Sequence, residues 1–186
     1  TQGVSSAASD VYKRQRFAFT QAAAVIDQPK ALEGMKVILH PEGRWVLRSA
    51  KTTQLLYAVL AKEAARDAGA DDAWLVDNGM ITEGTSANAH IIDSRGVLVS
   101  HPVDHGVLPG ISRLCILPLA REMGLAVEER AFSVEELFAA REAFISSATT
   151  VVMPVVEVDG RTIADGKPGV LSLELRQRYL ERLRKA

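Results

Sequence analysis

Two hairpin signals set the tightest limit on how this chain can fold. Asn78-Gly79 and Asp159-Gly160 each follow an apolar run, residues 73–76 in the first case and residues 145–158 in the second. Both residues of such a dipeptide tolerate positive φ, which suits the two-residue turn between antiparallel strands. The sequence therefore predicts hairpin-linked strands, and Pro154 predicts an interruption within the second run.

Helical segments alternate with these strands. A helix over residues 52–68 is predicted from apolar side chains at helical spacing, namely Leu55, Leu56, Val59 and Leu60. Pro109-Gly110 predicts the start of a helix that runs to about residue 123, with a kink or an early stop at Pro118. The capping-box pair Ser133 and Glu136 predicts a helix through residue 141, and residues 171–185 predict a charged last helix.

Further short strands are expected at residues 36–40, 44–48, 89–93 and 97–100. Strands joined mainly by hairpins and interleaved with helices predict an α/β domain of the mixed α+β type.

The formal charge of −1 provides no overall attraction to nucleic acid or to an anionic membrane. No apolar run approaches the roughly 20 residues that span a bilayer, and the single cysteine, Cys115, favours a reducing cytoplasm.

Four segments carry candidate chemistry, and each has an ordinary structural alternative. Lys51, between an expected strand and an expected helix, would be a nucleophilic amine if partly buried, or a lysine whose ammonium reaches water. Residues 82–88 place an acid among hydroxyls, or form a polar turn. Residues 109–113 offer helix N–H groups to a phosphate, or a plain helix cap. Residues 146–150 offer hydroxyls to the same phosphate, or form a polar edge strand.

Taken together, these segments resemble one family. They read Arg44-Trp45-x-x-Arg48-x-x-Lys51, Thr82-Glu83-Gly84, Leu108-x-Gly110-Ile111-Ser112-Arg113 and Phe144-Ile145-Ser146-Ser147-Ala148-Thr149. In this order and spacing they are similar to the class IV (fold-type IV) aminotransferases, which use pyridoxal 5'-phosphate (PLP). Within that family the D-amino-acid aminotransferases are most similar.

The resemblance implies a role for each matching residue. Lys51 would hold PLP as an internal aldimine and then move the proton between the substrate Cα and the cofactor. Glu83 would keep the pyridine nitrogen protonated so that the ring accepts carbanion charge. The remaining cofactor-binding residues would be an apolar residue against the ring, a polar partner nearby and two phosphate-binding segments: Leu108, Asn88, Ile111 and Ser112, and Ser147, Ala148 and Thr149. Ala148 departs from the threonine of many relatives, so a backbone N–H or Thr149 would replace that donor.

The resemblance also implies an organisation for the chain. Residues 29–186 would form the large C-terminal PLP-binding domain. Residues 1–28 would hold what remains of a small N-terminal domain, an interdomain segment and a non-native junction at about residues 4–15. The missing small domain would carry the groups that bind the substrate carboxylate, so half of the site would be absent.

The expected partners are small molecules and a second copy of the chain. The implied reaction transfers an amino group between an amino acid, a D-amino acid such as D-alanine, and a 2-oxo acid, in a homodimer. Branched-chain aminotransferase and aminodeoxychorismate lyase share the fold and remain alternatives, as does a truncated domain without activity. No metal site is expected, because the four histidines lack the spacing and the carboxylates of a metal-binding motif.

Overall fold

The computed structural model describes residues 18, 20, 25–104 and 106–185. The expected junction in the first 17 residues lies outside this part. The described residues form one sheet of ten strands, in the order β6-β5-β4-β8-β9-β1-β2-β3-β7, with β10 paired to β9. The strands are β1 (Met35–Pro41), β2 (Asp72–Asp77), β3 (Met80–Gly84), β4 (Asn88–Ile92), β5 (Leu98–Ser100), β6 (Val127–Glu129), β7 (Phe132–Ser133), β8 (Glu142–Ser147), β9 (Val151–Val158) and β10 (Arg161–Thr162).

Six of these strands close into a ring. The run β4-β8-β9-β1-β2-β3 returns to β4 through an additional β3–β4 pairing, in which Glu83 is opposite Asn88. Side chains from all six strands fill the interior, including Val37, Trp74, Ile81, Ile91, Ile145 and Met153. Burial of this apolar surface is the main force that holds a closed sheet of this size together.

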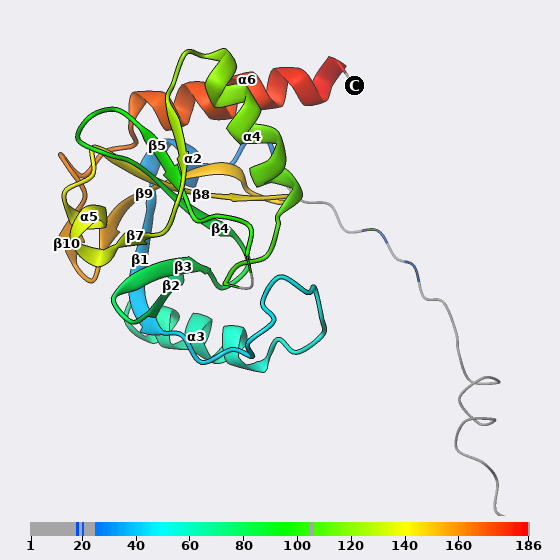
Figure 1. Ribbon diagram of the computed structural model, residues 1–186, viewed down its shortest axis with the longest axis vertical. Helices are drawn as coiled ribbons and strands as arrows, with labels where there is room; N and C mark the ends of the chain where they lie inside the picture. The colour runs from blue at the N-terminus through cyan, green and yellow to red at the C-terminus, as the bar shows by residue number, and fades with distance from the viewer. Residues whose placement is uncertain (1–17, 19, 21–24, 105, 186) are drawn as a thin grey trace, which may run out of the picture.

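Helices cover the outside of the ring. On one side, α4 (Ile111–Glu122) and α6 (Val170–Lys185) pack on each other and on β8 and β9, while α3 (Leu56–Asp67) covers β1 and β2 on the other side (Figure 1). Two short helices, α2 (Lys30–Glu33) and α5 (Val134–Phe138), complete the described elements. The sheet therefore separates a large helical layer from a single helix.

The alternation of side chains along the strands explains this layering. Phe144 on β8 and Val152 on β9 are buried against α4 and α6, whereas the next residues along, Ile145 and Met153, face the interior of the ring. Period-two alternation with both faces apolar is what a strand covered on both sides requires. The mixed α+β class predicted from the sequence is confirmed.

Several boundaries differ from the expectations. Both hairpins are confirmed: Asn78, Gly79, Asp159 and Gly160 all have positive φ. Pro154 does not interrupt its strand, because pairing of β9 with β1 begins only at Val155, so the missing N–H of Pro154 costs no hydrogen bond on that side. The break comes instead at residues 148–150, which form the turn between β8 and β9.

The expected strand at residues 44–48 is wrong: these residues form an irregular loop. Its apolar side chains point to solvent, with Val46 78% exposed, and its arginines turn toward buried acids.

The helix predicted from residue 52 begins at Leu56. The capping box at Ser133 is confirmed, but its helix ends at Phe138. Of the two outcomes expected at Pro118, a kink or an early stop, the early stop does not occur, because α4 continues to Glu122 with Leu119 and Ala120 buried.

Candidate active site

The two strands that close the ring carry the buried acid of the expected site. Glu83 on β3 is 3% exposed and Asn88 on β4 is 5% exposed. Asn88 Nδ2 donates to Glu83 Oε2 at 3.0 Å and to the carbonyl oxygen of Leu108 at 2.8 Å. The backbone N–H of Leu108 donates in turn to the Glu83 carboxylate at 3.2 Å. Three of the expected residues are thus brought together where the ring closes.

Arg44 adds a charged partner that sequence reasoning missed. Its Nη1 donates to Glu83 Oε1 at 2.6 Å, and its Nε and Nη2 donate to the carboxylate of Glu42. Arg48 lies 3.5 Å from the same Glu42 and 3.2 Å from Asp77. The sequence carries a signal for this role in Glu42, Arg44 and Arg48 around an apolar run, but the same run also predicts a strand, which does not form. This cluster sets three carboxylates against two guanidinium groups.

Burial and these partners shift the two acids in opposite directions. Burial raises the pKa of Glu83 above its ordinary value, although the charge and hydrogen bonds of Arg44 oppose the rise. Burial also acts to raise the pKa of Glu42, but hydrogen bonds and charge from Arg44 outweigh it, so the net shift is downward. Glu83 is therefore the more basic carboxylate of the pair, and it is the one better suited to accept a hydrogen bond from a protonated group.

The first turn of α4 presents backbone donors beside this acid. Gly110 precedes the helix with φ −64° and ψ 135° and provides no side-chain cap for the first N–H groups. A Cβ at Gly110 would lie 2.2 Å from Asn88 Oδ1, so only glycine fits there. The N–H groups of Ile111 and Ser112 begin the helix at this point, and such groups together with the helix dipole suit a phosphate.

Ser112, the next residue of the helix, is buried. It is 2% exposed, on the helix that packs against α6. Ile111, in contrast, is exposed. Arg113, also without a role in the sequence analysis, points away into the fold, where it donates to Ser100 Oγ, to the His101 carbonyl oxygen and to Glu129.

The second expected phosphate segment is the turn between β8 and β9. Its hydroxyl groups are largely bonded to each other: Ser147 Oγ accepts the N–H groups of Thr149 at 3.3 Å and Thr150 at 3.1 Å, and lies 2.8 Å from Thr150 Oγ1. Ala148 and Thr149 are exposed at the tip. Ser147 therefore shapes the turn, and the outward groups belong to Ala148 and Thr149.

Lys51 lies in the loop between β1 and α3. The partial burial considered from the sequence is wrong, because the side chain is exposed and the flanking segment is not a strand. The loop itself is tied to the acid by Arg44, seven residues before Lys51 in the chain.

The described histidines lie on different elements of the fold. His90 is fully buried, with Nε2 2.9 Å from Ser146 Oγ and its ring stacked on Phe144, and burial lowers its pKa to about 3. His105 lies outside the described residues. In the described part of the chain, no group of three His, Cys, Asp or Glu side chains is placed to hold a metal ion, and no helix there has the length and apolar character to cross a membrane.

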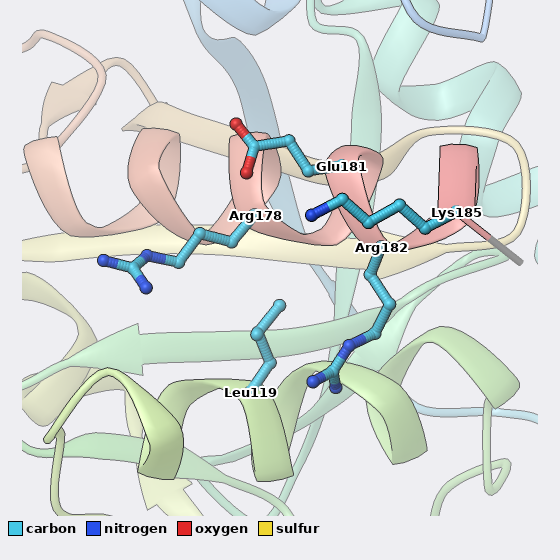
Figure 2. A pocket seen from close by; sticks show the side chains of 5 residues that line it. All are labelled: Leu119, Arg178, Glu181, Arg182 and Lys185. Atoms are coloured by element: carbon cyan, nitrogen blue, oxygen red, sulfur yellow. The ribbon is translucent and has the colours of Figure 1, made fainter.

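Two surface hollows lie elsewhere. One, of about 520 Å³, lies between α4 and α6, where Arg178, Arg182 and Lys185 extend from α6 and Leu119 of α4 faces them (Figure 2). The other, of about 720 Å³, is lined by residues of the 26–32 segment and of α6. Neither includes an expected site residue.

Comparison with known proteins identifies the family of this chain. The family described as Amino-transferase class IV matches residues 7–158. D-alanine aminotransferase of Bacillus licheniformis is 41% identical over 139 residues, which are 75% of this chain and 49% of that protein. A putative branched-chain-amino-acid aminotransferase of Methanocaldococcus jannaschii is 37% identical over 130 residues, which are 69% of this chain and 45% of that protein.

Solved structures show the same fold. The branched-chain amino acid aminotransferase of Thermobaculum terrenum, determined in its PLP-form, superposes with a TM-score of 0.73 at 26% identity, over 82% of this chain and 52% of that one. The chain spans about half the length of the curated relatives it matches. With a family match over most of its residues, the chain belongs to the class IV aminotransferases and has part of the fold-type IV architecture.

Proposed function

We propose that this protein is a PLP-dependent aminotransferase in which Lys51 binds the cofactor and Glu83 faces its pyridine nitrogen. The observation that carries the proposal is the buried Glu83 carboxylate, held by Asn88, Leu108 and Arg44 beside the uncapped start of α4. PLP, when bound, supplies the ring that delocalises the electrons left at the substrate Cα.

The residues present fit that cofactor. Glu83 is a buried carboxylate held in place by Arg44 and Asn88, and it would accept a hydrogen bond from a protonated pyridine nitrogen. At the other end, the N–H groups of Ile111 and Ser112 and the exposed groups of Ala148 and Thr149 would hold the phosphate. Leu108, whose backbone is bonded to both Glu83 and Asn88, would place its side chain against the ring.

Lys51 would act as the proton carrier. Its amine, released once substrate has bound, would take the proton from the substrate Cα and return it on the cofactor side. Arg44, seven residues before Lys51, ties the start of this loop to Glu83, and Lys51 would reach the cofactor from the same loop. Arg44 would also keep Glu83 ionised against the effect of burial, as the proton on the pyridine nitrogen requires.

For the substrate, we propose a D-amino acid such as D-alanine with a 2-oxo acid as the acceptor. Several of the curated relatives with 35–41% identity are D-alanine aminotransferases. A branched-chain substrate is the second candidate, supported by the names of the similar solved structures. A lyase reaction has no comparable support. The single cysteine, Cys115, is in keeping with a cytoplasmic enzyme.

We also propose a homodimer. The face of α3 that packs on the sheet consists of small residues, Ala58, Ala61 and Ala65. Its larger apolar residues point outward: Leu55, Leu56, Val59 and Leu60 are 58%, 73%, 51% and 56% exposed. A contiguous apolar surface of this kind marks an interface.

Turnover with defined substrates tests the proposal. The full-length, PLP-loaded protein, with the small domain that the resemblance implies, should release pyruvate from D-alanine with 2-oxoglutarate and show no activity with L-alanine. Glu83→Gln should still bind PLP but slow deprotonation of the substrate Cα, since an amide cannot hold the pyridine proton; a ~10²-fold or greater loss is typical of such groups. Turnover of L-leucine in place of D-alanine would support the branched-chain alternative, and unchanged single-turnover rates in Glu83→Gln would refute the role of Glu83.

A further inference from the structure

The side chain of Arg176 is buried in an unusual environment. It lies on α6, is 5% exposed, and its four hydrogen bonds all go to backbone carbonyl oxygens. Within the described part of the chain, none of the ion pairs involves Arg176. Burial without a carboxylate partner lowers the pKa of Arg176 and costs free energy. The hydrogen bonds that its guanidinium group donates indicate which parts of the chain it holds in place.

The four carbonyl oxygens belong to two segments far apart in the sequence. Nη1 donates to Thr150 at 2.6 Å and to Val152 at 2.8 Å. Nη2 donates to Val25 at 3.1 Å and to Ile26 at 2.9 Å. The planar guanidinium group thus connects the end of the turn between β8 and β9 with the segment at residues 25–26.

A second side chain makes a parallel connection. Gln28 Nε2 donates to the carbonyl oxygen of Thr149 at 3.0 Å. The carbonyl oxygen of Thr149 is therefore held by Gln28, and that of Thr150 by Arg176, which also contacts residues 25–26. Because a trans peptide group is planar, fixing a carbonyl oxygen also fixes the N–H that follows it. The N–H of Thr150 accordingly points at Ser147 Oγ, which shapes the turn.

The backbone next to this contact is strained. Val151 has φ 63°, a left-handed conformation that is costly for a β-branched residue, and it is 1% exposed. Such a conformation persists only where the surroundings impose it. Arg176 bonds the carbonyl groups on both sides of Val151, those of Thr150 and Val152, and supplies that restraint.

We propose that Arg176 is a positioning residue for the phosphate of the cofactor: it holds the turn at residues 147–150 in the form that presents Ala148 and Thr149, and couples this form to the segment at residues 25–28. The inference rests on the proposed function, because the turn is the second phosphate segment of that proposal. Without Arg176 the turn would relax its strain, and the donors at its tip would lose their alignment.

Comparison of two ligands isolates this effect. PLP and pyridoxal have the same ring and aldehyde, and only PLP has the phosphate. Equilibrium titration of the protein with each, followed by absorbance, gives the ratio of the two dissociation constants. Arg176→Met, which removes all donors at similar volume, should weaken PLP binding tenfold or more, about 1.4 kcal/mol, and leave pyridoxal binding within about twofold. The preference for PLP over pyridoxal, given by the ratio of the two dissociation constants, should therefore be largely lost.

Three further variants sharpen the test. Arg178→Met, two residues along α6 on the surface, is the matched control and should leave the ratio unchanged. Arg176→Lys, which keeps the charge but reaches fewer carbonyl groups, should give an intermediate ratio and covers the case in which Arg176→Met does not fold. Gln28→Ala, at the edge of the contact, should shift the ratio in the same direction by a smaller factor.

The outcomes separate the inference from the proposed function. If the unaltered protein does not prefer PLP to pyridoxal, the proposed function fails and the inference with it. If it does, and the Arg176 variants keep the same ratio or weaken both ligands equally, the inference alone is wrong. Amide hydrogen exchange without cofactor adds an independent readout: the N–H of Thr150 should exchange faster in Arg176→Met and at an unchanged rate in Arg178→Met.

Discussion

Asn88 and Glu83 are joined twice, once as opposite residues on the strands that close the ring and once by a side-chain hydrogen bond of 3.0 Å. The position of the buried acid is therefore set by the same pairing that closes the sheet. Asn88 also contacts Leu108, so it links the acid to the segment that leads into α4. Asn88 therefore contributes both to the pairing that closes the ring and to the geometry of the site.

Asn88→Ala should therefore destabilise the fold. It removes two hydrogen bonds in a buried place and leaves the carbonyl group of Leu108 without this donor, which costs about 1–3 kcal/mol. Urea unfolding followed by circular dichroism measures the change. Gln177→Ala, which removes a surface amide on α6, is the control and should change the free energy of unfolding by less than about 0.5 kcal/mol.

Gly110→Ala tests the close approach to Asn88. A methyl group 2.2 Å from Asn88 Oδ1 cannot be accommodated without movement, so the single variant should lose about 1–3 kcal/mol. In an Asn88→Ala background the obstacle is gone, and the same substitution should cost much less. A double-mutant cycle that gives additive effects would contradict the geometry, since residues in contact should couple.

Arg44→Met should be among the most destabilising surface-loop substitutions. It leaves Glu83 and Glu42 buried beside each other without their shared cation, a loss of about 3–5 kcal/mol. Protonation of the acids relieves the repulsion, so the loss should be smaller at pH 5 than at pH 8. Arg66→Met, which breaks an exposed pair with Glu63, should cost less than about 1 kcal/mol. A comparable loss in both variants would be inconsistent with the buried cluster.

The sequence predicted the parts of this arrangement that depend on local rules. Both hairpin turns, the capping box at Ser133 and the last helix follow from the conformational preferences of a few adjacent residues. The closure of the ring could not be predicted, because the Glu83–Asn88 pairing is set by the twist and stagger of six strands. The contacts of Arg44 and Arg176 were missed for the same reason: their partners are up to 151 residues away.

Titration of His90 should be visible in the stability of the protein. Burial holds the pKa of His90 at about 3 in the folded chain, against about 6.5 when unfolded. The unfolded state therefore binds the proton first, so stability is complete above about pH 6.5 and falls as the pH drops toward 3, by up to about 1.4 kcal/mol per unit. Denaturant unfolding at pH 7.5, 5.5 and 4.5 should show a flatter dependence in His90→Phe than in His40→Phe. Equal slopes would contradict the buried, neutral state.

Self-association should depend on the outer face of α3. Leu56→Glu combined with Leu60→Glu should shift the protein toward monomer without loss of helix, because both side chains are already exposed. Leu183→Glu, at an exposed leucine of α6, should leave association unchanged. Sedimentation velocity at micromolar concentration is the measurement, and a sharp monomer boundary for the unaltered chain would refute the dimer.

Borohydride reduction tests the central proposal most directly. Incubation of the protein with PLP, followed by reduction and peptide mass mapping, should place a phosphopyridoxyl group on Lys51. Lys51→Ala should abolish this label, and in the full-length protein it should also abolish turnover. Lys62, on α3, provides an internal control and should remain unlabelled at stoichiometric PLP. Labelling confined to other lysines, or near-native transamination by Lys51→Ala without added amine, would contradict the account.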